Sequence, residues 1–261
     1  MIHLKSAGEI EKMRRAGRIV AEVLMRMREW VRPGVTTAEL NEKAEELIRR
    51  RGGIPSFKGY PPGSPHPFPA AICTSINEEL VHGIPGPRVL KEGDIISIDV
   101  GAIYEGYHGD AGITLPVGEV SPEARRLLAV TEGALYAGVA QARAGNRVGD
   151  ISAAIQTFVE SRGYNVVRGY TGHGIGRQMH EPPQIPNHGE PGRGPLLRSG
   201  MTVAIETMVL AGDYQVRTLP DHWTVVSADG QLTAYFEHTV LIRDGEAEIL
   251  TPWHSGFVGE R

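Results

Sequence analysis

The feature that most constrains the fold is an internal repeat, in which a pair of helical segments and a set of strands recur about 110 residues later. Adding 111 pairs Arg32 with Arg143, Gly34 with Gly145, Leu40 with Ile151, Leu47 with Phe158, Ile48 with Val159, Arg51 with Arg162 and Gly52 with Gly163. Further along, an offset of 107 relates the segment around Asp99 to the segment around Glu206. We therefore expect one domain over residues 1–261, with halves of roughly 6–118 and 119–250.

Each half begins with two helices. Ser6 with Glu9 and Thr36 with Glu39 have the spacing of a capping box, which marks the first turn of a helix. Apolar residues at helical spacing follow both boxes. The remaining expected boundaries are stops at 32–34 and 52–53, a third helix that begins at Ser121-Pro122, and a fourth helix over 149–163.

Composition narrows the class of protein. Gly 33 and Pro 18 gather in short clusters between periodic segments, which favours an α+β fold. The 27 Lys and Arg residues against 31 Asp and Glu give no basic field for nucleic acid or an anionic membrane. A single cysteine, Cys73, suits a reducing compartment, and no targeting or membrane-spanning segment is evident. We expect a cytoplasmic protein without nucleic-acid or membrane partners.

Two aspartates lie on a predicted hairpin over residues 97–114. Pairing Asp99 with Asp110 centres the turn between Tyr104 and Glu105 and makes the two carboxylates face each other. Directly opposed side chains have Cβ atoms about 5 Å apart, where two like charges repel by roughly 3 kcal/mol at an effective dielectric constant near 20. The arrangement needs compensation.

The second half supplies two more acids inside strands. Asp229-Gly230, between 223–228 and 231–242, predicts a type I′ hairpin that brings Glu237 into a strand. Alternation puts Glu237 on the face of Tyr235 and Thr239. A lone acid in a strand usually faces solvent, but four acids at strand centres are costly to bury unless cations compensate them. Two divalent ions bridged by shared carboxylates, about 3.5–4 Å apart, would do so.

Three of the histidines stand in glycine-flanked or similarly open segments, namely His82, His173 and His180. One of these histidines would serve as a metal ligand, and the other two would lie beside the carbonyl that reacts. His108 shares the face of Asp110 and is assigned to packing. Surface positions are expected for His3, His66, His188, His222 and His254. The glycines around His173 do not follow the strand–loop–helix order of a dinucleotide-binding loop.

Five motifs in order resemble a known family: "HGIP" (82–85), "IDVGAIYEGYHGD" (98–110), "GHGIGRQMHEPP" (172–183), "AIET" (204–207) and "YFEHTV" (235–240). They are similar to those of type I methionine aminopeptidase, from the first helix to about Leu250. The resemblance implies a pita-bread (creatinase/aminopeptidase) fold, with pseudo-twofold halves, a curved antiparallel sheet inside and helices outside.

The resemblance also implies the site. Its five metal ligands would be Asp99, Asp110, His173, Glu206 and Glu237, with Asp110 and Glu237 bridging the two ions. A hydroxide held between the ions would attack the first peptide carbonyl, since bound divalent metals acidify water. The substrate's α-amine would take an open coordination position. Glu206 would carry the proton, with His82 near the leaving nitrogen and His180 on the oxyanion. The donors suit Co, Mn, Fe or Zn.

The methionine pocket, on the same resemblance, comprises Phe68, Cys73, His82, Met179, His180 and Trp223, although Met179 and Trp223 could equally be core residues. The chain departs from the commoner pattern at "GYPPGSPHPFP", where Pro and Gly replace or displace an aromatic pocket residue. Asn77, Glu79 and Thr233 match positions that offer oxygen to a monovalent cation. We expect a monomer that acts on N-terminal methionyl peptides and on nascent chains at the ribosome.

Two other functions remain open. A proline-specific peptidase, prolidase or aminopeptidase P, shares the five-ligand scheme, but such enzymes usually carry an additional N-terminal domain, and only about 90 residues precede the Asp99 strand. A non-catalytic binding protein with this fold would be expected to have lost ligands. Type II methionine aminopeptidases need a helical insertion between His180 and Glu206, for which the 25 intervening residues leave no room.

Overall fold

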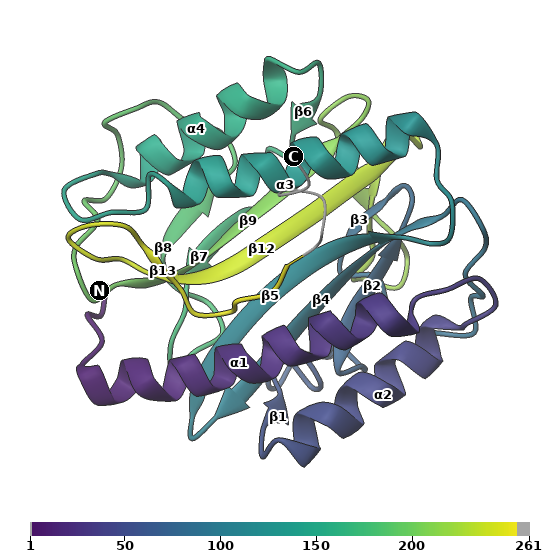
Figure 1. Ribbon diagram of the computed structural model, residues 1–261, viewed down its shortest axis with the longest axis horizontal. Helices are drawn as coiled ribbons and strands as arrows, with labels where there is room; N and C mark the ends of the chain where they lie inside the picture. Colours follow the sequence, from purple (N-terminus) through teal and green to yellow (C-terminus); the bar gives the residue numbers. More distant parts are fainter. Residues whose placement is uncertain (1, 255–261) are drawn as a thin grey trace.

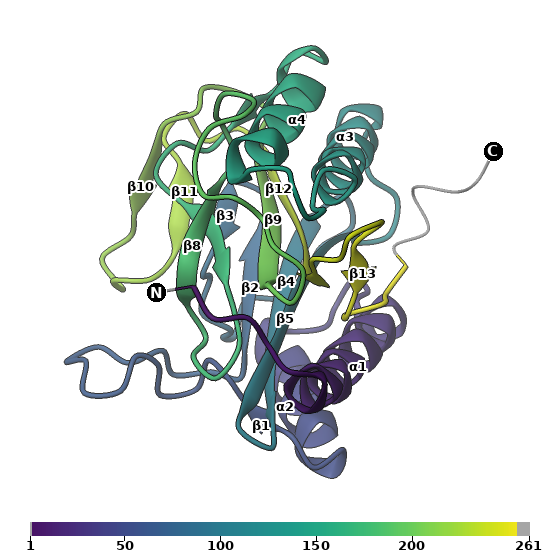
Figure 2. The same ribbon diagram turned by 90° about the vertical axis from the view of Figure 1, so that its left-hand side faces the viewer.

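The computed structural model describes residues 2–254. Within that range, four α-helices lie on the outer face of the strands in two antiparallel pairs (Figures 1 and 2). The first pair is α1 (Ala7–Trp30) and α2 (Thr37–Arg50), and the second pair is α3 (Pro122–Val139) and α4 (Val148–Glu160). None of the helices in residues 2–254 has both the length and the apolar character needed to cross a bilayer.

The predicted helix starts are confirmed by their hydrogen bonds. At α1 the Ser6 hydroxyl accepts from the Glu9 amide at 3.4 Å, and the Ser6 amide donates to the Glu9 carboxylate at 2.8 Å. Thr36 and Glu39 make the same reciprocal pair at α2, at 3.2 and 2.7 Å. The Ser121 hydroxyl caps α3 by accepting from the Ala124 amide at 3.1 Å. Each cap satisfies amide groups that the helix itself leaves unpaired.

The strands form three sheets. In the first sheet β4 (Ile95–Tyr104) is central, with β5 (Tyr107–Pro116) on one side and β1 (Ile54–Pro55) and β2 (Ile72–Ile76) on the other. The second runs β13 (Glu248–Ile249), β12 (Thr233–Leu241), β9 (Thr202–Leu210), β7 (Thr171–Gly174), β8 (Glu181–Pro186), with β6 (Asn165–Val166) also on β9. The small third sheet joins β10 (Val216–Thr218), β11 (Val225–Ser227) and β3 (Glu79–Val81).

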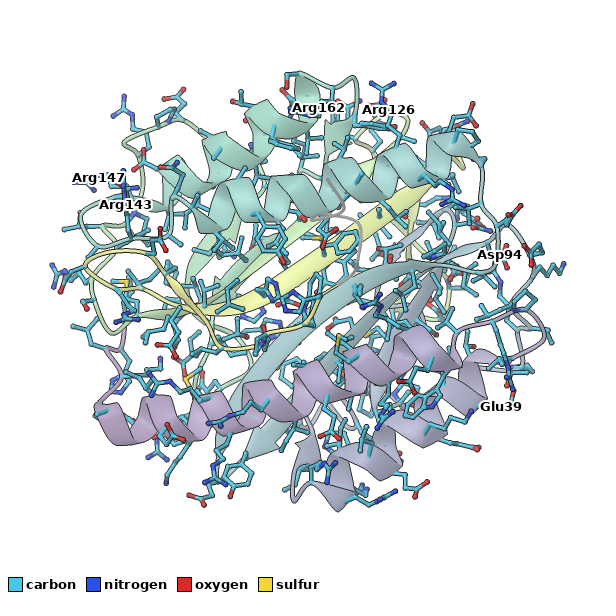
Figure 3. All side chains as sticks on the ribbon, in the orientation of Figure 1. Glu39, Asp94, Arg126, Arg143, Arg147 and Arg162 are labelled. Carbon is cyan, nitrogen blue, oxygen red and sulfur yellow. The ribbon has the colours of Figure 1, made fainter. Side chains whose placement is uncertain are left out.

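The internal repeat is visible in the elements themselves. The offset of 111 carries the first residue of α2 onto that of α4 and β1 onto β6, and the offset of 107 carries the first residue of β4 onto that of β9. Even the glycines with positive φ correspond: φ is 92° and 93° at Gly34 and Gly145, and 91° and 89° at Gly93 and Gly200. In Figure 3 the labelled Arg143 and Arg147 mark the start of α4 and Arg162 its end.

The predicted register of the first hairpin was wrong by two residues. Asp99 lies opposite Gly112, and Asp110 lies opposite Gly101, so the two aspartates are diagonal neighbours rather than a facing pair. The loop contains only Glu105 and Gly106, both with positive φ, 47° and 79°. This is the backbone of a type I′ turn, in which a two-residue loop matches the twist of its strands. Both aspartates keep the same face of the sheet.

The predicted hairpin at Asp229-Gly230 was also wrong. β11 pairs with β10 and β3, whereas β12 pairs with β9 and β13, so the turn connects two different sheets. Only Gly230 has positive φ there, at 73°, whereas a type I′ turn needs positive φ at both positions. The Ser227 hydroxyl holds the turn by donating to the Gln231 carbonyl at 2.7 Å. The predicted place of Glu237 in the interior of β12 is confirmed.

The first two sheets meet along β5 and β12, and two threonine hydroxyls join them. Thr239 on β12 accepts from the Asp110 amide at 3.0 Å and donates to the Asp110 carbonyl at 2.7 Å. Thr114 on β5 makes the matching pair with the backbone of Tyr235, at 2.9 and 2.8 Å. We call this contact the threonine seam. It sets β12 at a fixed height relative to β5, with Glu237 level with Gly112.

Helix α1 approaches the first sheet at backbone distance. A Cβ on Gly109 of β5 would lie 2.7 Å from the amide nitrogen of Gly17, and a Cβ on Gly17 would lie 2.0 Å from the carbonyl oxygen of Leu250. The neighbouring residues Met13, Val20 and Leu24 are fully buried. Glycine is required at both contacts because the nearest atoms belong to the backbone, which cannot turn aside for an added Cβ as a flexible side chain can.

We predict that Gly17→Ala lowers the free energy of unfolding by about 1–3 kcal/mol, the usual cost of overpacking a filled interior. Urea unfolding monitored by circular dichroism measures the change. The matched control is Gly8→Ala on the same helix, where an added Cβ would meet nothing within 4 Å. Equal midpoints for the two variants would contradict the packing at Gly17.

Candidate metal centre and substrate cavity

Four acids from the central strands of both halves meet at the threonine seam. Asp99 and Asp110 come from β4 and β5, and Glu206 and Glu237 come from β9 and β12. Glu206 and Glu237 are directly paired across their strands. Because Glu237 is level with Gly112, it is also level with Asp99, the residue opposite Gly112. A bare glycine is needed at 112, since a Cβ there would lie 1.9 Å from the Tyr235 ring.

His173 on β7 completes the group. Its Nδ1 donates to the Gly174 carbonyl at 2.8 Å, which leaves the Nε2 lone pair directed at the acids. Nε2 lies 3.8 Å from Asp110 Oδ2 and 3.7 Å from Glu206 Oε1, too far for a hydrogen bond. The flanking glycines are required, because a Cβ on Gly172 or Gly174 would lie within 2.4 Å of a backbone carbonyl oxygen.

The electrostatics of the cluster are those of charges held out of water. Burial raises the pKa of Asp99 to about 7. Burial and then the charges of Glu237 and Asp99 raise the pKa of Asp110 well above its ordinary range. The pKa values of Glu206 and Glu237 are raised well above theirs for the same reasons. Burial lowers the pKa of His173 to about 3, so its imidazole is neutral.

Several oxygens in this cluster have no hydrogen-bond partner. They are Asp99 Oδ1, Asp110 Oδ1 and Glu237 Oε1, all buried. Buried acceptors are normally satisfied, so each of these oxygens needs an explanation. Ligand atoms of Asp110, His173 and Glu237 lie within 4.8 Å of one another. Oxygen donors with one neutral imidazole suit divalent Mn, Fe, Co or Zn, so these residues fit a metal centre.

The two other singled-out histidines, His82 and His180, line the same cavity. His82 follows β3 with φ at 61°, and burial lowers its pKa to about 4. His180 precedes β8, and its Nδ1 lies 2.6 Å from the hydroxyl of Tyr60. The His180 ring centre is 4.3 Å from that of His173. All three imidazoles therefore border one space.

The predicted pocket residues are also brought together. The cavity that contains Asp99, Asp110, His173 and Glu206 is also lined by Phe68, Cys73, His82, Met179, His180 and Trp223. Met179 and Cys73 are buried against Phe57 and Phe68, and Trp223 packs beside them. One end of the cavity is thus acidic, and the other is apolar and aromatic.

Sequence reasoning missed three residues that line this cavity, Phe57, Tyr60 and Tyr235. The expectation that an aromatic residue was replaced before Phe68 is corrected by Tyr60, which reaches the cavity and contacts His180. The sequence signal for this residue was the aromatic side chain directly before Pro61-Pro62. The Tyr235 hydroxyl donates to Glu237 Oε2, and alternation already placed these two residues on one face.

The remaining candidates are placed as follows. His108 is buried, with Nδ1 2.9 Å from the Ser56 hydroxyl, as its packing assignment predicts. The expected monovalent-cation residues do meet, because the Thr233 hydroxyl donates to the carbonyls of Asn77 and Glu79 at 3.0 and 2.9 Å. The Glu79 carboxylate is engaged elsewhere, with Arg88 at 2.7 Å.

Comparison with known proteins agrees with this geometry. The sequence profile of metallopeptidase family M24 matches residues 11–244, which include the four acids and all three imidazoles. The chain belongs to metallopeptidase family M24. Among M24-like structures, the methionine aminopeptidase crystal structure from Thermotoga maritima is 47% identical with a TM-score of 0.93, covering 96% of this chain and 99% of that chain. The expected pita-bread fold is confirmed.

Relatives of similar length share much of the sequence. The methionine aminopeptidase of Clostridium acetobutylicum is 56% identical over 252 residues, which cover 96% of this chain and 99% of that protein. Methionine aminopeptidase 1 of Bacillus subtilis is 52% identical over 96% of this chain and 99% of its own length. The prolidase of Pyrococcus furiosus is 24% identical with a TM-score of 0.77, which shows a shared fold alone.

We predict that Asp99→Asn stabilises the metal-free chain at pH 7.5 and that this gain disappears near pH 4. The pKa of Asp99 is about 7 in the folded chain against an ordinary 3.8, so folding binds a proton between those values. Stability from this group is therefore complete below about pH 4 and is lost as the pH rises through 7. Thermal melts in EDTA from pH 4 to 7.5 should show the variant melting at least about 2 °C higher at the upper end.

The matched control is Asp244→Asn, which changes an exposed acid outside the cluster. Its melting temperature should follow the wild-type curve at every pH. A constant difference between Asp99→Asn and wild type from pH 4 to 7.5 would contradict the raised pKa.

Proposed function

We propose that this chain removes the N-terminal methionine from peptides and nascent proteins, using two divalent metal ions. The observation that carries the proposal is the convergence of four carboxylates and one neutral imidazole at the end of an apolar cavity. Asp110 and Glu237 are buried, Asp99 and Glu206 are half-buried, and three of the carboxylate oxygens have no partner. The nearly full-length similarity to proteins named methionine aminopeptidase supports the same activity.

The ions would be held by Asp99, Asp110, His173, Glu206 and Glu237, with Asp110 and Glu237 shared between them. Neighbouring donors support this assignment: Gly174 fixes the His173 tautomer, and Tyr235 holds one oxygen of Glu237. When bound, such a metal pair supplies a water acidic enough to act as a nucleophile near neutral pH and polarises the carbonyl that it attacks.

The chain's own groups then perform the proton transfers. The Tyr60 hydroxyl lies 2.6 Å from His180 Nδ1. With the hydroxyl as the donor of this bond, His180 Nε2 would carry the ring proton and would donate to the oxyanion that develops on the carbonyl. Glu206 accepts the proton of the attacking water and passes it to the leaving nitrogen, next to His82. The low pKa of His82, about 4, keeps this imidazole neutral near the leaving group.

The cavity explains the choice of residue. Phe68, Met179 and Trp223 form an apolar wall for an unbranched thioether side chain. The acidic end attracts the positively charged α-amine of the substrate, which restricts cleavage to the first peptide bond. The Asn77, Glu79 and Thr233 cluster would bind a monovalent cation through its backbone carbonyls and hydroxyl. We further propose a monomer that acts in the cytoplasm on nascent chains.

Hydrolysis of Met-Ala-Ser and Ala-Pro-Phe with added Mn or Co tests the proposal. We predict release of methionine from the first peptide, no cleavage of the second, and loss of activity in EDTA that Mn or Co restores. Cleavage of Ala-Pro-Phe alone would instead identify a proline-specific peptidase. Cleavage of neither peptide would favour a binding protein with this fold.

We predict that His180→Ala lowers kcat for Met-Ala-Ser by about 10²–10³, the usual cost of losing one oxyanion donor. Its Mn content, measured by calorimetric titration, should equal that of wild type because His180 holds no ion. His254→Ala, which removes an exposed imidazole outside the cavity, should leave both quantities unchanged. Loss of bound Mn in His180→Ala would mean that His180 is a ligand.

A further inference from the structure

Residues 61–67, "PPGSPHP", form a largely exposed loop between Tyr60 and Phe68, which we call the strap. The segment projects from the body of the molecule at the lower left of Figure 2. Four of its seven residues are proline, whose fixed φ removes most of the conformational freedom of such a loop. The strap therefore has a defined shape without contributing to the buried core.

Backbone hydrogen bonds close the base of the strap. The Phe68 amide donates to the Tyr60 carbonyl at 2.7 Å, and the Gly59 amide donates to the Phe68 carbonyl at 2.8 Å. The two residues at this base, Tyr60 and Phe68, both line the catalytic cavity. The strap thus begins and ends on cavity walls.

The far end of the strap is attached to the other half of the chain. The His66 ring stacks on the His222 ring, with centres 4.1 Å apart and planes 19° from parallel. The His66 carbonyl accepts a hydrogen bond from Trp223 Nε1 at 3.0 Å. His222 and Trp223 lie in the loop that connects the antiparallel strands β10 and β11 of the third sheet. The strap therefore connects cavity walls from the two halves of the chain, Tyr60 and Phe68 on one side and Trp223 on the other.

The residue that the strap holds is itself a wall of the cavity. The Trp223 ring stands edge-on to Phe68 with centres 5.2 Å apart and to His82 with centres 6.1 Å apart. Its indole N–H has its hydrogen-bond partner on the strap, because the acceptor is the His66 backbone carbonyl. The position of this wall therefore depends on the shape of the strap.

We propose that the strap is a specificity-determining element, which fixes Trp223 so that the apolar end of the cavity accepts methionine and rejects side chains of other width. This inference rests on the proposed function. One extra or missing methylene group in a hydrophobic pocket changes kcat/KM by about 10–200-fold. We expect this discrimination to fall when a wall of the pocket can move aside. The strap thus sets selectivity among first residues, and the metal centre sets the chemistry.

The test replaces residues 61–67 with Asn-Gly. A two-residue turn keeps the hydrogen bond from the Phe68 amide to the Tyr60 carbonyl and removes the contacts to His222 and Trp223. We expect the ratio of kcat/KM for Met-Ala-Ser over Leu-Ala-Ser to fall at least tenfold, with the number of bound Mn ions unchanged. His66→Ala, which removes only the ring stacking, should lower the ratio by a smaller factor, and His254→Ala should not change it.

A second readout needs neither metal nor substrate. In protein labelled with 5-fluorotryptophan, Trp223→Phe identifies the Trp223 resonance, and Trp30 and Trp253 serve as internal references. Shortening the strap should shift and broaden the Trp223 signal alone. A displaced Trp253 signal would show that the shortened variant is misfolded. In that case the selectivity ratio of His66→Ala decides the proposal. An unchanged ratio in a folded variant, or an unmoved Trp223 signal, would overturn the proposal. Failure of wild type to cleave Met-Ala-Ser would refute the proposed function instead.

Discussion

The threonine seam is the interaction on which the rest of the site depends. Two hydroxyls, from Thr114 and Thr239, each bind the amide and the carbonyl of one residue on the opposite strand. Because both bonds of each pair end on backbone atoms, the height of β12 relative to β5 cannot slip without losing four hydrogen bonds at once. The seam therefore joins the β4–β5 pair and the β9–β12 pair into one surface on which acids from both can meet.

The cost of that meeting is electrostatic. Burial alone raises the pKa of every acid in the cluster, and the neighbouring acids raise three of these pKa values further. Isolated charges in this place would be neutralised by protons or would open the structure. Cations bound to the unpartnered oxygens of Asp99, Asp110 and Glu237 would offset the repulsion between the acids and would be held by their attraction to the carboxylates. The same property that weakens the metal-free fold would thus make the metal-bound form stable.

Much of this arrangement follows from the sequence, and the exceptions have physical causes. Capping boxes and strand alternation are local patterns, and they correctly place the helix starts and the face of Glu237. Register is less local. A Glu in left-handed backbone at position 105 shortens the loop to two residues, so the centre of the turn lies one residue beyond the predicted place between Tyr104 and Glu105. The Asp229-Gly230 turn has hairpin chemistry, but its strands join different partners. The role of Tyr60 was not predicted, because its place beside His180 depends on a contact between residues that are 120 positions apart in the chain.

The close approach of α1 to the first sheet has a consequence for how sequence variants of this chain should be interpreted. Gly109 touches the backbone of Gly17 and lies next to Asp110 in the chain, while Gly17 in turn touches the carbonyl of Leu250. A substitution on the outer helix at Gly17 can therefore displace the strand that carries Asp110, because Gly17 and Gly109 are in contact through their backbones. Remoteness from the active centre is for that reason a poor guide to which positions evolution can vary.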